Sequence, residues 1–171
     1  MGKTLRHQVV ALWLDVAATK PPGLPPQVRT GAARRRAECM LDSAERGTAR
    51  LLVGTEAEHL RAVCFLVPNT SPVMAHWCML TAVMVHPSCQ RRGLGRRLVS
   101  HALEWAQEMG YEAVYLIARA DRWLEAFYAS CGFREVGRSP GAIREHDHRI
   151  HDLVHLWCGL GIAQPTHDSG Q

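Results

Sequence analysis

The stretch from residue 83 to residue 97 constrains the fold more than any other, because an apolar β-type run there breaks into a basic turn and then a helix. It reads Val-Met-Val-His-Pro-Ser-Cys-Gln-Arg-Arg-Gly-Leu-Gly-Arg-Arg. Gly93 and Gly95 lack a Cβ, so the backbone of the turn can approach a ligand closely. The free N–H groups of the following helix would point at a site that the helix dipole makes positive. The pattern predicts an anion-binding turn, with a phosphate-bearing ligand as the first hypothesis.

Length and composition restrict the class of protein. The 171 residues predict one domain, placed at residues 1–160, followed by a flexible tail at 161–171. A hydrophobic fraction of 47% is typical of a globular chain, and no apolar run is long enough to span a bilayer. The formal charge is +4, but the basic residues fall in two clusters rather than one stripe and only 6% of the residues are aromatic, so we expect no nucleic-acid partner. Without a spanning apolar run we expect no membrane partner either. Six scattered cysteines without paired spacing predict reduced thiols and a cytoplasmic location.

Hydrophobic periodicity predicts a mixed α/β fold. Helices are expected over residues 4–18, from just after residue 26 to about 45, over 96–109 and over 121–130. Strands are expected over residues 49–54, 59–67, 75–86, 113–118, 133–138 and 150–157, with a loop at 20–26 and a polar excursion at 139–149. The strand, basic turn, helix and strand between residues 75 and 118 form a β-α-β unit, whose two strands should be parallel.

Two familiar phosphate motifs do not fit the turn. A P-loop needs four residues between its glycines, followed by Lys and Ser or Thr, whereas one residue separates Gly93 from Gly95 and Arg96 follows. A dinucleotide fingerprint needs a third glycine, but position 98 is Leu. A nicotinamide-cofactor fold is therefore not expected.

Gln90, Gly93 and Gly95 instead resemble the acetyl-CoA-binding motif of the GCN5-related N-acetyltransferase (GNAT) superfamily. That motif is Gln or Arg, two variable residues, Gly, one variable residue, then Gly or Ala. The resemblance extends over residues 77–137 and includes a second signature, Tyr-x-x-x-Gly-Phe, from Tyr128 to Phe133. It implies the GNAT fold: a mixed β-sheet with helices on both faces and a central splayed β-α-β unit. The family normally begins with a strand, so we expect this chain to lack the first one.

The resemblance also implies how acetyl-CoA binds, as a co-substrate and without a metal. Backbone groups of Val83, Met84 and Val85 would pair with the pantetheine arm like an added strand. The pyrophosphate would lie on the turn, formed by Gln90, Arg91, Arg92, Gly93, Leu94, Gly95 and Arg96. Asp121 occupies a position where the family often has an asparagine that contacts the pantetheine, although an ionised Asp cannot donate a hydrogen bond.

Catalysis needs an acid and a base. Tyr128 matches the family position whose phenol protonates the departing CoA thiolate. The oxyanion of the tetrahedral intermediate would be stabilised by a strand N–H near Val85. An ammonium substrate must lose a proton before it can attack, so a base or a water chain is required. Because no acyl-enzyme is needed, Cys89 and Cys131 receive no catalytic role.

The base is not identified by resemblance. Ribosomal-protein alanine acetyltransferases share the run Gln-Arg-Arg-Gly-Leu-Gly-Arg and place a glutamate on the strand before the second helix, where this chain has Leu116. Residue type alone suggests several candidates, which are His86, Glu125, His146, His148 and Asp152. The histidines at 146, 148, 151 and 155 also allow a metal site, but a histidine-rich surface loop is the favoured interpretation.

The leading hypothesis is an enzyme that moves acetyl from acetyl-CoA to the primary amine of a small molecule, by direct attack in a ternary complex. The segment 140–157 loosely resembles the ending of small-molecule members of the superfamily, with Asp152 before the final strand. A protein N-terminal or lysine acetyltransferase is one alternative, and a non-catalytic acyl-CoA sensor is another. The sequence leaves the acceptor and a homodimeric state open.

Overall fold

Six strands form one sheet within residues 2–19, 26–144 and 148–161, the parts of the chain that the computed structural model describes. The helices are α1 (Lys3–Thr19), α2 (Pro26–Glu45), α3 (Leu94–Glu108) and α4 (Arg122–Ala129). The strands are β1 (Arg50–Glu56), β2 (His59–Pro68), β3 (Trp77–Val85), β4 (Ala113–Arg119), β5 (Arg134–Arg144) and β6 (Ile150–Gly159). Short 3-10 turns cover Pro72–Met74 and Pro87–Cys89. None of the described helices is both long and apolar enough to cross a membrane.

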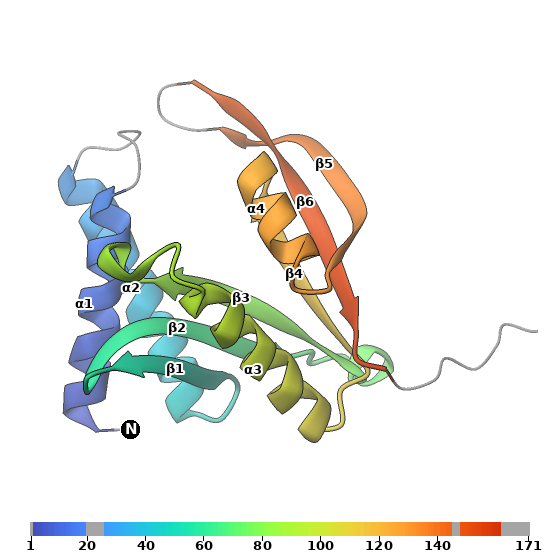
Figure 1. Ribbon diagram of the computed structural model, residues 1–171, viewed down its shortest axis with the longest axis horizontal. Helices are drawn as coiled ribbons and strands as arrows, with labels where there is room; N and C mark the ends of the chain where they lie inside the picture. The colour runs from blue at the N-terminus through green and yellow to red at the C-terminus, as the bar shows by residue number, and fades with distance from the viewer. Residues whose placement is uncertain (1, 20–25, 145–147, 162–171) are drawn as a thin grey trace, which may run out of the picture.

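The strands lie in the order β1-β2-β3-β4-β6-β5, and the sheet is open (Figure 1). All neighbouring pairs are antiparallel except β3 and β4, which are parallel as the β-α-β pattern predicts. The mixed α/β fold is thus confirmed. The first strand of the described sheet is β1, which follows both α1 and α2.

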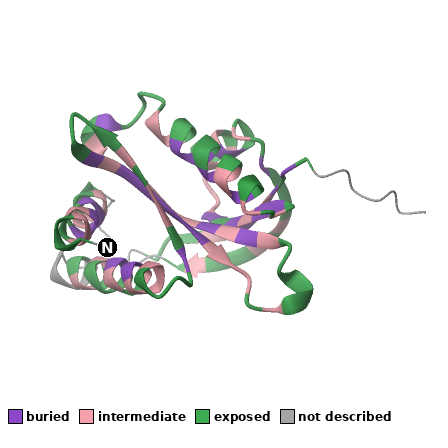
Figure 2. Cartoon of the chain, turned by 90° about the horizontal axis from the view of Figure 1, so that it is seen from below, coloured by how far each residue is buried: buried purple, intermediate pink, exposed green. Residues whose placement is uncertain are grey.

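Helices cover both faces of the sheet, each over its own hydrophobic core. Val9 and Trp13 of α1 and Leu41 of α2 pack on β2, where Trp13 lies 6.2 Å from Phe65 between ring centroids. On the other face, α3 and α4 pack on β2, β3, β4 and β6 around a second core that includes Val99. Figure 2 shows the buried residues concentrated on the strands between these two layers.

Two local predictions were wrong. The fifth strand was expected to end at residue 138, but β5 continues to Arg144 and pairs Ile143 with His151 of β6. Pairing with β6 overrides the poor strand propensity of Pro140 and Gly141, and a register shift between Ser139 and Ile143 accommodates them. Helix α3 begins at residue 94, two residues earlier than expected. Residues 20–25 of the loop predicted at 20–26 and residues 162–171 of the tail predicted at 161–171 lie outside the described residues.

Candidate functional site

The parallel strands β3 and β4 are paired only at their beginnings. Three residue pairs join them, from Trp77 with Ala113 to Met79 with Tyr115. Strand β3 then continues to Val85 and β4 to Arg119 without further pairing between them. The predicted splayed β-α-β unit is therefore present, and the edge of β3 from residue 80 to 85 that faces β4 has no strand partner in the described sheet.

A bulge in β3 coincides with this splay. Ala82 has φ 53°, and the pairing with β2 shifts register between Val63 and Phe65. Before the bulge, Leu80 belongs to the core under α3, and after it Val85 packs against the same core. The alternation of side chains has thus moved by one residue, which is what a β-bulge does to a strand.

The backbone of Val85 turns toward the open edge. The N–H of the next residue, His86, donates to the Arg61 carbonyl of β2 at 2.7 Å, so its backbone groups point at β2. Because these directions alternate along a strand, the groups of Val85 and Val83 point the other way. The Gln90 side-chain amide donates to the Val85 carbonyl at 3.1 Å and ties the turn to the strand. The arrangement leaves strand N–H groups facing the gap, as the predicted pantetheine contact requires.

The basic turn has the backbone of an anion site. Arg91 has φ 61° and Gly93 has φ 80°, and Gly93 is the N-cap of α3 without any side-chain cap. The first N–H groups of α3, including those of Leu94 and Gly95, therefore have no partner within the helix. The side chains of Arg91, Arg92 and Arg96 are exposed around them. The predicted residues of the turn are brought together at one helix N-terminus.

Gly95 explains the close fit of the turn against its neighbours. A Cβ at this position would lie 3.5 Å from Val85 Cγ2 and 3.5 Å from Phe127 Cζ, which is ordinary van der Waals contact. The family pattern allows Gly or Ala at this position, and the structure has room for the Cβ of an alanine there. The first turn of α3 thus lies directly on the end of β3 and on α4. Phe127 was not singled out in the sequence, although it immediately precedes the tyrosine of the second signature.

Tyr128 lies on α4 inside the core that α3 and α4 share. Its ring contacts Phe127 at 5.0 Å and Phe133 at 5.8 Å between centroids, and the residue is 8% exposed. Burial raises the pKa of the Tyr128 phenol to about 12, and the nearby thiols of Cys131 and Cys64 add to the effect. The phenol is therefore protonated at neutral pH and has a proton to donate.

Asp121 and the acidic base candidates are engaged in structural contacts. Asp121 caps α4 by accepting from the Trp123 N–H at 2.9 Å, so its predicted contact with the pantetheine stays a prediction. Glu125 and Asp152 both form ion pairs with Arg138, at 2.9 and 3.6 Å. Asp152 also accepts from the N–H of residue 141 at 2.9 Å. These carboxylates join α4, β5 and β6 rather than projecting as bases.

The histidine candidates are no better placed. His86 Nδ1 lies 2.7 Å from Ser88 Oγ, and its Nε2 lies 3.6 Å from Asp15 Oδ2. His148 is exposed, and His146 lies outside the described residues. Over the part of the chain that the structure describes, no group of three or more His, Cys, Asp or Glu side chains is arranged to hold a metal ion.

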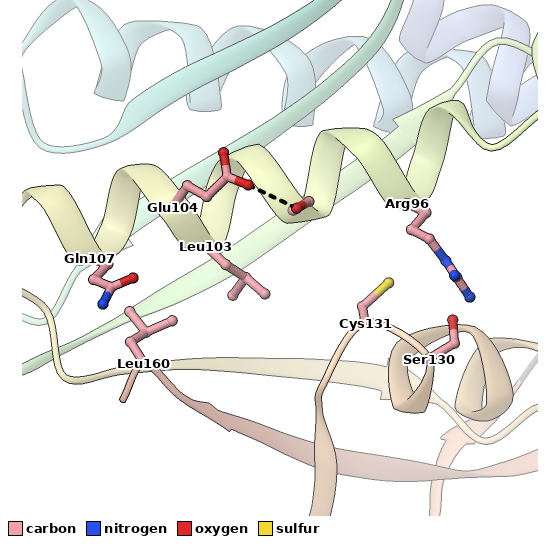
Figure 3. Close-up of a pocket in the computed structure, with 8 residues that line it drawn as sticks. Arg96, Leu103, Glu104, Gln107, Ser130, Cys131 and Leu160 are labelled. Atoms are coloured by element: carbon pink, nitrogen blue, oxygen red, sulfur yellow. Dashed lines mark hydrogen bonds between the residues drawn. The ribbon is translucent and has the colours of Figure 1, made fainter. Parts of the chain in front are cut away.

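A groove of about 290 Å³ runs beside the turn, between α3 and the segment that follows α4 (Figure 3). Arg96 and Ser130 face each other near one end, and Leu160 and Gln107 lie near the other. Cys131 also lines the groove, and burial raises the pKa of its thiol. The sequence predicted only Arg96 among these residues, because the others carry no motif and meet only in the folded chain.

Comparisons with known proteins agree with this geometry. Residues 15–133 match the family model described as the acetyltransferase (GNAT) family. The fold is similar to that of a ribosomal-protein-alanine N-acetyltransferase from Brucella melitensis, with 17% identity and a TM-score of 0.73 over 93% of this chain and 96% of that one. It is also similar to a putative acetyltransferase from Salmonella typhimurium with its cofactor acetyl-CoA, with 17% identity and a TM-score of 0.75 over 96% and 94% of the two chains. A spermidine N-acetyltransferase chimera built in part from the Vibrio cholerae protein matches with 16% identity and a TM-score of 0.71 over 94% and 92%.

Proposed function

The chain belongs to the acetyltransferase (GNAT) family, and from this premise we propose that it transfers acetyl from acetyl-CoA to the primary amine of a small molecule by direct attack in a ternary complex. The observation that carries the proposal is the open edge of β3 next to the anion-binding turn. Gln90 joins the two by its hydrogen bond to Val85. One ligand that has both a pyrophosphate and an amide-bearing arm matches this pair of features.

The residues of the turn and of β3 have separate tasks in this proposal. The N–H groups of Leu94, Gly95 and Arg96 bind the pyrophosphate, and the exposed arginines offset its charge. The backbone of Val83 and Val85 pairs with the pantetheine arm. A strand N–H on the open edge of β3 donates to the oxyanion when the amine attacks the thioester carbonyl. The C–N bond forms and the C–S bond then breaks.

Tyr128 completes the step. Its phenol donates a proton to the sulfur as the C–S bond breaks, and the phenolate later recovers a proton that originates from the amine. The pKa of about 12 favours this role, because the phenol starts protonated and the phenolate is a strong enough base to be reprotonated quickly.

Two observations bear on the acceptor and on the location of the protein. Leu116 is 2% exposed and lies in the core, so the position at which ribosomal-protein alanine acetyltransferases would place a glutamate holds no base. That supports a small-molecule amine over a ribosomal-protein N-terminus. All six cysteines are free thiols, which supports a cytoplasmic location.

The test is thiol release from acetyl-CoA with a panel of aliphatic amines, aromatic amines, polyamines and amino-terminal peptides. We expect turnover with at least one small amine. In Tyr128→Phe, kcat should fall on the order of 10²-fold or more, because general acid catalysis contributes about 10²–10⁴-fold. CoA affinity should be unchanged in that variant.

The matched control is Tyr111→Phe. Burial raises the pKa of Tyr111 as well, but this residue follows the C-terminal end of α3, away from the turn. Its substitution should leave kcat intact. Tight CoA binding without turnover of any amine would favour an acyl-CoA sensor, and faster turnover of peptides than of small amines would favour a protein acetyltransferase. An unchanged rate in Tyr128→Phe would remove the proposed acid.

A further inference from the structure

A hydrogen-bonded chain of three side chains crosses the last three strands of the sheet. The Tyr115 hydroxyl of β4 bonds to His155 Nδ1 of β6. His155 Nε2 lies 3.0 Å from Ser139 Oγ of β5. All three side chains are only partly exposed. None of these three side chains has a role in the proposed acetyl transfer.

These hydrogen-bonded side chains lie on the face of the sheet opposite α3 and α4. Val114 and Leu116, on either side of Tyr115 in sequence, point into the core under α3 and α4, and Val154 and Leu156 do the same on either side of His155. Because side chains alternate along a strand, Tyr115 and His155 point to the other face. The core beneath α1 and α2 contains no residue of β4, β5 or β6 among the described residues. Figure 1 shows α1 and α2 set apart from these three strands.

Tyr115 also marks the point at which β3 and β4 separate. It pairs with Met79 in the last of the three residue pairs that join the two strands. The proposed donor occupies the side of α3 and α4 and extends down the open edge of β3 toward this point. An amine that attacks the same thioester must arrive from the other side, where Tyr115 points.

We infer that Tyr115, His155 and Ser139 form the proton-accepting relay for the amine in the transfer reaction. The inference rests on the proposed function and supplies the base that the sequence could not identify. The amine it fits is one that is protonated at neutral pH, because an amine that is already neutral does not need a proton removed before it attacks.

Aromatic packing fixes the geometry of the relay. Trp77 lies edge-on against Tyr115, with ring centroids 5.7 Å apart, and edge-on against Trp157 at 5.8 Å. The His155 ring stacks on Tyr115 at 6.0 Å. The phenol is thus held between an indole and an imidazole, which limits its rotation. A positioned hydroxyl is what a relay needs, since proton transfer requires a fixed donor and acceptor.

The proton balance closes with His155 as a neutral imidazole that carries its proton on Nε2. That N–H donates to Ser139 Oγ, and Nδ1 accepts from the Tyr115 hydroxyl. The ammonium passes a proton to the Tyr115 oxygen while the original phenolic proton moves to Nδ1. The result is a neutral amine, an unchanged phenol and an imidazolium that still donates to Ser139. The imidazolium then releases its extra proton to solvent.

The experiment compares His155→Gln and Tyr115→Phe with wild type on two acceptors of nearly the same shape. Benzylamine is an ammonium at neutral pH, whereas phenylhydrazine, in which NH replaces the methylene, is neutral. If neither is a substrate, the best amine of the panel and its hydrazine counterpart take their place. We expect kcat with the ammonium to fall on the order of 10²-fold in both variants, and kcat with the hydrazine to fall less than about tenfold. His151→Gln, four residues away on the same strand, is the matched control and should keep both rates.

The outcomes separate the two proposals. Equal losses on both acceptors indicate a structural role and overturn the relay, as does an unchanged rate on the ammonium. In either case amine acetylation by the wild type still stands. If the wild-type protein binds CoA but acetylates no acceptor, the proposed function fails and the relay fails with it.

Discussion

Gly93 and Gly110 form a matched pair for testing the anion-binding turn. Gly93 has φ 80° and Gly110 has φ 84°, and a Cβ at either position would meet no atom within 4 Å. Alanine therefore adds no clash at either site and costs only the left-handed backbone conformation, about 1 kcal/mol. For a chain of this length that corresponds to a fall in Tm of about 2–4 °C. We expect Gly93→Ala and Gly110→Ala to lose the same stability without ligand.

Only one of the two glycines precedes N–H groups that would bind the pyrophosphate. An added Cβ at Gly93 would keep the ligand from approaching the backbone of the turn closely. Loss of one hydrogen bond to a charged group costs about 1.5–3 kcal/mol, so CoA should bind Gly93→Ala about tenfold or more weakly. At a CoA concentration 100 times the wild-type Kd, ligand binding stabilises wild type by about 2.7 kcal/mol, and a tenfold weaker site by about half as much. Differential scanning fluorimetry with and without CoA measures both quantities. Equal ligand-induced shifts in Gly93→Ala and Gly110→Ala would refute the assignment of the turn.

Two further predictions concern thiols and the ion-pair cluster. At pH 8 a thiol reagent should modify the exposed Cys39 quickly but should leave Cys64 and Cys78 unmodified until the protein unfolds. The reason is that burial raises the pKa of the Cys64 and Cys78 thiols to about 12. Mass spectrometry of the labelled protein identifies the modified sites. Arg138→Met should destabilise the protein at pH 7 but not at strongly acidic pH. Arg138 lowers the pKa of Glu135 in the folded protein, so the ion pair stabilises the fold above the pKa that Glu135 has in the unfolded chain. This stabilisation is lost as pH falls through the pKa of Glu135 in the folded protein. Urea unfolding across pH measures it, and a constant difference in unfolding free energy between wild type and Arg138→Met would contradict the prediction.

The order of helices and strands could be predicted because each element carries its own periodicity. Leu98, Val99, Ala102 and Ala106 repeat at helical spacing, and all four are buried on one face of α3. The end of β5 could not be predicted, because residues 139–144 become a strand only through pairing with β6. The bulge could not be predicted either, since Ala82 has a positive φ that alanine rarely adopts and that no local sequence pattern indicates.

The candidate site also has a part that the sequence predicts and a part that it does not. The turn was predictable because its residues are contiguous and its glycines have a direct physical reason. The proposed base was not predictable, because residue type alone selects Glu125 and Asp152, which form ion pairs with Arg138 in the fold. Tyr115 and His155 are 40 positions apart in sequence, and no spacing rule connects them.

The gap between β3 and β4 is maintained by what each strand does on its other edge. After the bulge, β3 remains paired with β2 through Val63 with Met84 and Ala62 with Val85. Strand β4 remains paired with β6 over its whole length, as far as Arg119 with Leu153. The bulge increases the local twist of β3, so the two strands diverge while each stays hydrogen-bonded to its outer neighbour. An opening held by strand pairing needs no ligand to form it, which leaves the binding energy of CoA available for positioning the thioester.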